Sequence, residues 1–191
     1  MAKNNKEIQT HFDKYEKLLG GKKNCEKKII ILDEIKNNHS DTRLKSAKVE
    51  HPTIKMDMEL LIESKIYDKR SFKFKLRAKD LTVEPFFRFD SDGVSHLNKT
   101  PLTPLNELKI DTPHFHKFDN EGRNIAYQTD SLKNATTREI LLNDVSLCMA
   151  HYCDESKTYY NSEYIEIKQT PTSELDLDTD SFNPLNGVDY E

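Results

Sequence analysis

Apolar residues recur at helical spacing near the start of the chain. In residues 4–19 they are spaced by four, three and four positions, at Ile8, Phe12, Tyr15 and Leu19. This spacing predicts a helix with one buried face, which Gly20-Gly21 would end. Asn24 can cap a second helix, whose apolar residues would pack back against the first: Ile29, Ile30, Leu32 and Ile35. The sequence therefore predicts an N-terminal helical hairpin.

The apolar period changes to two from Ile54 onward. One predicted strand has a buried face formed by Ile54, Met56, Met58, Leu60 and Ile62. The next predicted strand alternates Phe72, Phe74, Leu76 and Ala78 with Lys73, Lys75, Arg77 and Lys79. The short connection between the two strands predicts that they are antiparallel.

Three more strands are predicted before a long helix. They cover residues 86–90, 107–118 and 123–128, and the last two form a hairpin. Thr136 and Glu139 have the spacing of a capping box, which predicts the start of the helix. A final strand over residues 159–168 would turn Ile165 and Ile167 inward.

These elements predict an α+β fold: an antiparallel β-meander with the N-terminal helical hairpin and one long C-terminal helix packed on it. We expect three parts, a helical arm over residues 1–50, an α+β core domain over residues 51–169 and an acidic, flexible tail over residues 170–191. No Lys or Arg follows Lys168, and the tail is the acidic part of a chain whose net charge is −4.

Composition argues against a membrane protein and against a disulfide-stabilised one. Even the apolar run Ile29-Ile30-Ile31-Leu32 is far too short to cross a bilayer. The 3 cysteines are an odd number without framework spacing, which indicates a reducing compartment. The first residues lack the apolar run of a signal peptide. We therefore expect a cytoplasmic protein.

Four cations would project from one face of the strand that begins at Phe72, about 7 Å apart along it. This interval is close to the phosphate spacing of an extended nucleic-acid strand, so we predict nucleic-acid contacts at Lys73, Lys75, Arg77 and Lys79, and also at Arg123. The alternative is an edge strand that its lysines protect from aggregation. The acidic tail would either cover this face or act only as a solubilising segment.

His114 and His116 are two residues apart in a predicted strand, so their imidazoles share one face. If the chain folds back through the loop with Pro101 and Pro104, further polar groups converge on them. The candidate catalytic residues are then His96, His114, His116, Arg88 and Asn98. Such a set suits RNA cleavage without a metal or other cofactor, because imidazoles can move the protons while a guanidinium and an amide stabilise charge on phosphorus.

Two other interpretations of the same residues stay open. In a metal site, His114 and His116 would offer two nitrogens to Zn²⁺, with His96 and Asp90 as further ligands. In a purely structural role, the histidines would form local hydrogen bonds. A metal site at Cys148, His151 and Cys153 is disfavoured, because helical spacing turns Cys153 roughly 140° away from Cys148.

The central segment resembles an uncharacterised family of small bacterial, phage and mobile-element proteins. The motifs that carry the resemblance are Arg88-Phe89-Asp90, His96-Leu97-Asn98, Pro113-His114-Phe115-His116 and the glycine-led strand Gly122 to Tyr127. Together they span about a fifth of the chain. The resemblance implies a mobile-element setting and no particular mechanism.

The leading hypothesis is a protein that binds nucleic acid, RNA rather than DNA, and a stronger form of this hypothesis adds RNA cleavage. An alternative is a non-enzymatic inhibitor, similar to anti-CRISPR proteins, that blocks a nucleic-acid-guided nuclease or its guide RNA. A further alternative is a metal-dependent hydrolase.

Overall fold

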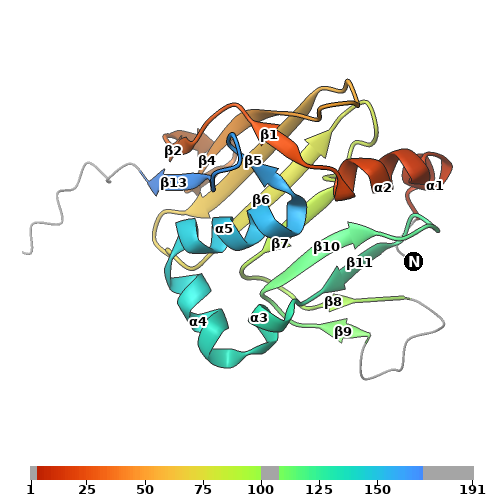
Figure 1. Ribbon diagram of the computed structural model, residues 1–191. Coiled ribbons are helices and arrows are strands. Elements are labelled where there is room, and N and C mark those ends of the chain that lie inside the picture. Colours follow the sequence, from red (N-terminus) through yellow and green to blue (C-terminus); the bar gives the residue numbers. More distant parts are fainter. Residues whose placement is uncertain (1–3, 100–107, 170–191) are drawn as a thin grey trace, which may run out of the picture.

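The computed structural model describes residues 4–99 and 108–169 (Figure 1). The helices are α1 (Lys6–Thr10), α2 (Phe12–Gly20), α3 (Asp130–Lys133), α4 (Ala135–Asn143) and α5 (Val145–Ser156). The first strands are β1 (Lys23–Cys25), β2 (Ile29–Leu32), β3 (Glu34–Lys36), β4 (His39–Glu50), β5 (Met58–Lys65) and β6 (Phe72–Ala78). They are followed by β7 (Phe87–Asp90), β8 (His96–Leu97), β9 (Lys109–Ile110), β10 (His114–Phe118), β11 (Asn124–Tyr127), β12 (Thr158–Tyr159) and β13 (Glu166–Gln169).

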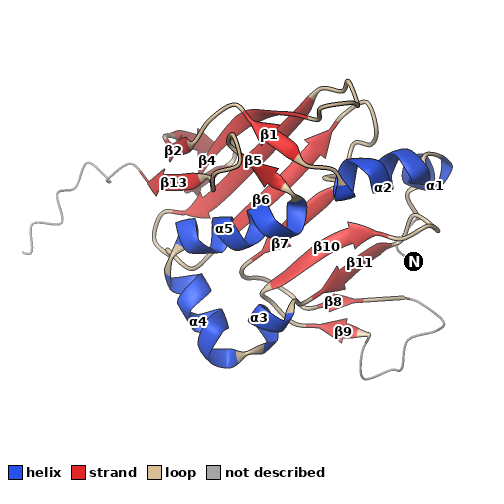
Figure 2. Ribbon diagram, viewed as in Figure 1, coloured by secondary structure: helices blue, strands red, loops and turns tan. Residues whose placement is uncertain are grey.

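One large sheet organises the fold, which is α+β as predicted (Figure 2). Its strand order is β11-β10-β7-β6-β5-β4-β1-β12, and β3 pairs with β4 at one side. The predicted strand pair at residues 54–62 and 72–78 is present as β5 and β6, which are antiparallel. The predicted hairpin is present as β10 and β11.

The core lies between this sheet and α5, which runs across one of its faces (Figure 1). Alternation in β6 buries Phe72, Phe74 and Leu76 on that face. The Tyr152 ring of α5 lies 5.4 Å from Phe74 and 5.5 Å from the β7 residue Phe87, centroid to centroid. The opposite face, here called the open face, carries most polar residues of the central strands: Glu59, Glu63, Lys73, Lys75, Arg77, Arg88, Asp90, His114 and His116.

The predicted second helix of the N-terminal hairpin is wrong, because residues 23–50 form four strands. In β2, Ile30 and Leu32 are buried while Ile29 and Ile31 are exposed, a period of two that β-branched side chains favour. The long strand β4 pairs with β5 from Thr42↔Lys65 to Val49↔Met58. Residues 1–50 therefore contribute strands to the central sheet.

The predicted antiparallel meander is also wrong, because the sheet is mixed. Strand β1 pairs with β12 in parallel, and β2 pairs with β13 in parallel in a separate two-stranded sheet. These pairings join the start of the chain to residues 158–169, so the sheet cannot be built from sequential hairpins alone.

The predicted single C-terminal helix is divided. Asp144 ends α4 and caps α5, accepting hydrogen bonds from the backbone amides of Ser146 and Leu147. Helix α4 is capped by Asn134 and not by Thr136. The single strand predicted over residues 159–168 is wrong, because β12 and β13 are separate, but Ile165 and Ile167 are buried as predicted.

No helix within the described residues is long and apolar enough to cross a membrane. The predicted acidic tail, residues 170–191, and most of the predicted proline loop lie outside the described residues.

Candidate functional site

The pairing of β7 with β10 gathers the polar residues of the central segment. In this antiparallel pair Asp90 lies opposite His114, and Arg88 lies opposite His116. Because residues directly opposite each other point to the same face, all four side chains lie on the open face. Lys73, opposite Asp90 on the other neighbouring strand β6, lies on the same face.

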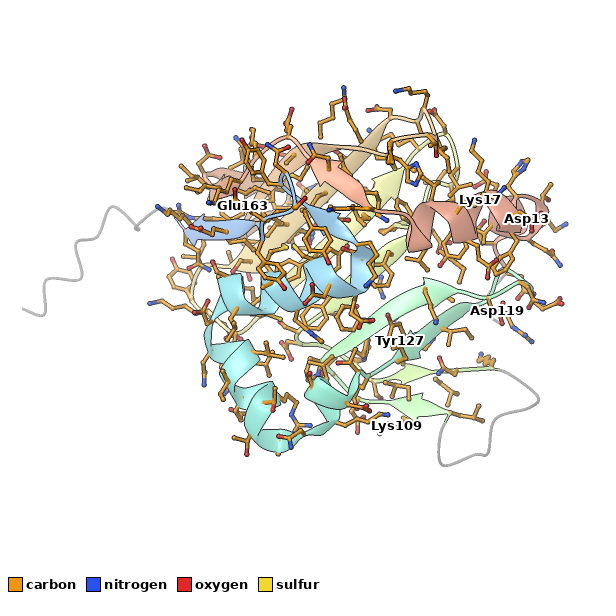
Figure 3. All side chains as sticks on the ribbon, viewed as in Figure 1. Asp13, Lys17, Lys109, Asp119, Tyr127 and Glu163 are labelled. Carbon is orange, nitrogen blue, oxygen red and sulfur yellow. The ribbon has the colours of Figure 1, made fainter. Side chains whose placement is uncertain are left out.

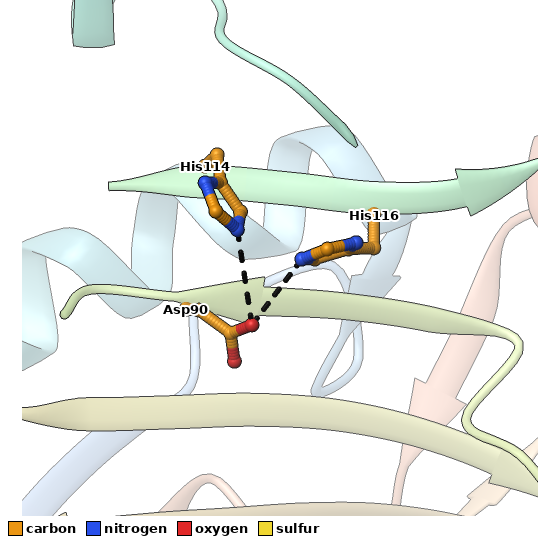
Figure 4. A group of neighbouring side chains, drawn as sticks. All are labelled: Asp90, His114 and His116. Carbon is orange, nitrogen blue, oxygen red and sulfur yellow. Dashed lines mark ion pairs between the residues drawn. The ribbon is translucent and has the colours of Figure 1, made fainter. Parts of the chain in front are cut away.

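Asp90, His114 and His116 form a compact group (Figure 4). Nε2 of His116 lies 3.3 Å from Oδ2 of Asp90, and Nε2 of His114 lies 3.9 Å from the same oxygen. One nitrogen or oxygen from each residue lies within 4.8 Å of the others, the only such group of His, Cys, Asp and Glu in the described part of the chain. The side chains are buried, with exposed fractions of 6% for Asp90, 2% for His114 and 3% for His116.

In His114 and His116, the ring nitrogen that points away from Asp90, Nδ1, contacts an oxygen acceptor. Nδ1 of His114 lies 3.2 Å from the backbone carbonyl oxygen of Asp111. Nδ1 of His116 lies 2.8 Å from the side-chain oxygen of Asn124. With an acceptor at Nδ1, the neutral form of each imidazole carries its proton there and its lone pair on Nε2, the nitrogen that faces Asp90. Outer-shell contacts of this kind orient histidines that bind metals.

His96 lies beside the group without joining it. Its ring centroid is 4.9 Å from that of His116 and 6.4 Å from that of His114. Its Nε2 lies 3.1 Å from the backbone carbonyl oxygen of Asn124. Asn124 therefore holds both His96 and His116, the first through its backbone and the second through its side chain.

The guanidinium of Arg88 contacts Oδ2 of Asp90 and Nε2 of His116, the two atoms that face each other inside the group. Its Nε lies 3.0 Å from Oδ2 of Asp90, and its Nη2 lies 2.8 Å from Nε2 of His116. A guanidinium only donates hydrogen bonds, so the short contact to His116 fits a lone pair on Nε2. The guanidinium thus sits against the two atoms that a cation held by this group would use.

The second carboxylate oxygen of Asp90 is unusual for a buried group. Oδ1 has no hydrogen-bond partner among the described residues, and Nζ of Lys73 lies 3.8 Å from it. Burial by itself would raise the pKa of Asp90, but His116, Arg88 and Lys73 outweigh it and hold that pKa below its usual value. The carboxylate is therefore charged near neutral pH, and its Oδ1 atom is available as a metal ligand.

Burial, and after it the neighbouring His116 ring, lower the pKa of His114 to about 4. The pKa of His96 is lowered for the same two reasons. Near neutral pH the His114 imidazole is thus uncharged. It can accept a proton or bind a metal ion, but it has no imidazolium proton to donate to a leaving group.

Asn98 is placed away from this centre. Its carboxamide pairs with the backbone of Ala126 on β11, with Nδ2 2.8 Å from the carbonyl oxygen and Oδ1 2.8 Å from the amide nitrogen. The structure thus brings together His96, His114, His116 and Arg88 of the predicted catalytic set, and uses the amide of Asn98 at the edge of the sheet.

The cations predicted to contact nucleic acid are partly engaged by carboxylates of the neighbouring strand. Nζ of Lys75 lies 2.8 Å from Glu63, which also binds Lys36 at 2.9 Å. Nη1 of Arg77 lies 3.7 Å from Glu59. Lys75 and Arg77 of β6 therefore help to neutralise the carboxylates of β5.

Lys79 and Arg123 lie at the ends of their strands. Lys79 follows β6 and is exposed. Arg123 lies in the β10–β11 turn, where its Nε is 2.7 Å from the carboxylate of Asp119, a residue labelled in Figure 3. The predicted row of four cations on β6 is thus reduced, because Lys79 lies beyond the strand and Lys75 and Arg77 pair with carboxylates of β5. Lys73 is the member of this row that pairs with Asp90.

The two cysteines near His151 lie in the core. Cys148 and Cys153 are buried, and burial raises the pKa of the Cys153 thiol to about 12. His151 Nε2 lies 2.9 Å from the hydroxyl oxygen of Thr129. Each group therefore has a structural role in packing or hydrogen bonding.

Sequence reasoning missed Asn124, which positions two imidazoles, and the carbonyl of Asp111. The signal for Asn124 lay in the hairpin, because the register of a short turn places Asn124 and Ala126 on the same face as His116. The Asp111 carbonyl belongs to the backbone and leaves no trace in residue type.

Comparisons with known proteins add no relative, since no family model, curated protein or solved structure matches this chain. The geometry of the open face is therefore the basis for inferring function.

Proposed function

We propose that the protein binds a divalent transition-metal ion through Asp90, His114 and His116. The observation that carries this proposal is the convergence of two Nε2 lone pairs and a carboxylate within 4.8 Å of one another, in a setting where acceptors already hold both Nδ1 atoms. Neutral imidazoles and a charged carboxylate are the protonation states that metal binding requires.

Two imidazoles and one carboxylate are a donor set used for Zn²⁺ and for non-haem Fe²⁺. Three protein ligands leave at least one coordination position for water or substrate, as in hydrolytic centres. The proposal therefore favours a metal-dependent enzyme, with hydrolysis as the reaction class. Cleavage of RNA by paired imidazoles without metal receives less support, because both rings are almost fully buried.

A metal titration tests the proposal. The full chain, freed of metal with a chelator, is titrated with Zn²⁺ by calorimetry and with Co²⁺ by visible absorption, which reports coordination number. We expect one ion per chain, with binding lost in His114→Ala, His116→Ala and Asp90→Asn. His39→Ala is the matched control, because His39 is exposed on β4 and lies outside the group.

A variant of Asn124, which orients His116 without being a proposed ligand, separates a specific metal site from nonspecific metal binding by histidines. Asn124→Ala removes the acceptor of His116 Nδ1 and leaves every ligand in place, so metal affinity should fall by roughly 10–100-fold. Stoichiometric binding that survives the ligand variants, or no binding at all in a folded wild-type chain, would refute the proposal.

Nucleic-acid binding without metal is a second candidate function. It is favoured by the partly exposed cations Lys73, Arg77 and Arg88 on the open face. Fluorescence anisotropy with a labelled single-stranded RNA in chelator, repeated over a range of salt, tests it. Affinity that does not fall as salt rises would mean that these cations contact few phosphates.

A further inference from the structure

Arg88 and a metal ion would compete for the same atoms. The guanidinium contacts Oδ2 of Asp90 and Nε2 of His116, at 3.0 and 2.8 Å, and both atoms belong to the proposed ligand set. A divalent ion at that position would repel the permanent positive charge of the guanidinium at close range. Arg88 must therefore move when metal binds, and its side chain is already 32% exposed to solvent.

Charge around the loaded centre would be unbalanced. Asp90 is the only carboxylate of the group, whereas Arg88 and Lys73 both lie within 4 Å of it. The next carboxylate on this face, Glu63, already binds Lys36 and Lys75. A divalent ion would add two charges to a partly buried region that has no spare carboxylate among the described residues, so an anion is needed to balance it.

Two cations, Arg88 and Lys73, are placed to contact such an anion. Arg88 on β7 and Lys73 on β6 are neighbours on the open face, with side chains 32% and 43% exposed, while the imidazoles beneath them are buried. A phosphate group offers separate oxygens to a metal, a guanidinium and an ammonium, and the planar fork of arginine matches two of them.

We infer that the metal-loaded centre binds a phosphate group, as an ester or as free phosphate, between the open coordination position, Arg88 and Lys73. This inference rests on the proposed metal site. In the metal-free protein Arg88 is held by Asp90 and His116, and the anion site is incomplete. Metal loading therefore creates the anion site by releasing the guanidinium.

The test compares two probes on two forms of the protein. The chain is loaded with one equivalent of Zn²⁺, freed of excess metal and titrated by calorimetry with dimethyl phosphate or inorganic phosphate. The metal-free chain is titrated in parallel. We expect binding at least about tenfold tighter to the loaded form, the effect of one charge-assisted contact. Preference for dimethyl phosphate would identify a diester such as nucleic acid as the ligand class, and preference for inorganic phosphate a monoester or the free ion.

Arg88→Met separates the two proposals. It should bind Zn²⁺ as tightly as the wild type or more tightly, because the competing cation is gone, and it should bind phosphate at least about tenfold more weakly. Lys73→Met should show a weaker loss of phosphate affinity, and Lys65→Met, an exposed lysine of β5, should show none.

The outcomes are distinct. Unchanged phosphate affinity in both Arg88→Met and Lys73→Met, or weaker Zn²⁺ binding in Arg88→Met, would overturn the anion site and leave the metal site in place. A wild-type chain that takes up no metal would overturn the proposed function and this inference together.

Discussion

Asn98 pairs with Ala126 as a neighbouring strand would. Its side-chain nitrogen donates to the Ala126 carbonyl oxygen, and its side-chain oxygen accepts from the Ala126 amide, both at 2.8 Å. Strand β11 ends the strand order of the main sheet, so one carboxamide here substitutes for the backbone of a missing partner. It also ties the β8–β9 hairpin to that edge.

Asn98→Ala should lower the free energy of unfolding by roughly 1–3 kcal/mol, because the buried amide and carbonyl of Ala126 lose their partners. Urea denaturation measures this loss, and hydrogen exchange should show faster exchange of the Ala126 amide. Equal stability and equal exchange in wild type and Asn98→Ala would contradict the edge role.

Lys23 stabilises the end of α2 by donating from its buried side-chain nitrogen to three backbone carbonyls. Its Nζ lies 2.6 Å from the oxygen of Leu18, 3.2 Å from that of Leu19 and 2.7 Å from that of Gly21. Lys23→Met keeps the aliphatic part and leaves these acceptors without the donor, which should cost roughly 1–3 kcal/mol in a denaturant titration. Lys17→Met, at an exposed position of α2 (Figure 3), is the control and should change stability little. A loss of the same size in both variants would argue against a special role for Lys23.

Gly122 is needed for the contact between the β10–β11 turn and the N-terminal segment. It has a positive φ of 70°, and a Cβ there would lie 2.2 Å from the backbone oxygen of Asn5. Its own carbonyl accepts a hydrogen bond from the Asn5 amide at 2.7 Å. Gly122→Ala should therefore lose about 2 kcal/mol or more of stability. Gly20→Ala, where a Cβ meets nothing within 4 Å, should be neutral or stabilising by thermal denaturation; equal effects would contradict the steric explanation.

Acidification should destabilise the metal-free protein through His114. Its pKa is about 4 in the folded chain, against an ordinary value of 6.5, so between these pH values the unfolded chain binds a proton that the folded chain does not. Stability from this group is full above about pH 6.5 and falls toward pH 4, by on the order of 3 kcal/mol in total. The charged and titratable groups that face it are Asp90, His96 and His116.

Urea titrations in chelator at several pH values measure this effect. His114→Gln should lose less stability than the wild type between pH 7 and pH 5, because the group that resists protonation is gone. His39→Ala should follow the wild type. Parallel pH curves for wild type and His114→Gln would show that His114 does not contribute.

The strands that alternate cleanly could be predicted from sequence. Residues 72–78 place an apolar side chain at every second position, and β6 follows that pattern. Strand β4 could not be predicted in this way, because its polar residues hide the period and its conformation depends on pairing with β5. The run at Ile29 fits helix and strand alike over so few residues, and the distant partner β13 decides for strand.

The candidate site was predictable as a set of residues more than as a geometry. His114 and His116 share a face because strand alternation requires it. That Asp90 lies opposite His114 depends on the register between β7 and β10, which the intervening segment does not reveal. Likewise, Lys75 pairs with Glu63 because β5 and β6 are neighbours in the sheet. From residue type alone, Lys75 is predicted to be an unpaired cation.

The parallel pairs β1–β12 and β2–β13 link the first and last described strands of the fold. During synthesis, β1 and β2 can therefore form these parallel pairs only after residues 158–169 have left the ribosome. Contacts so distant in sequence slow folding, since a long loop must close before they form. Strand β2, whose strand partner is the late strand β13, therefore completes its pairing late in folding.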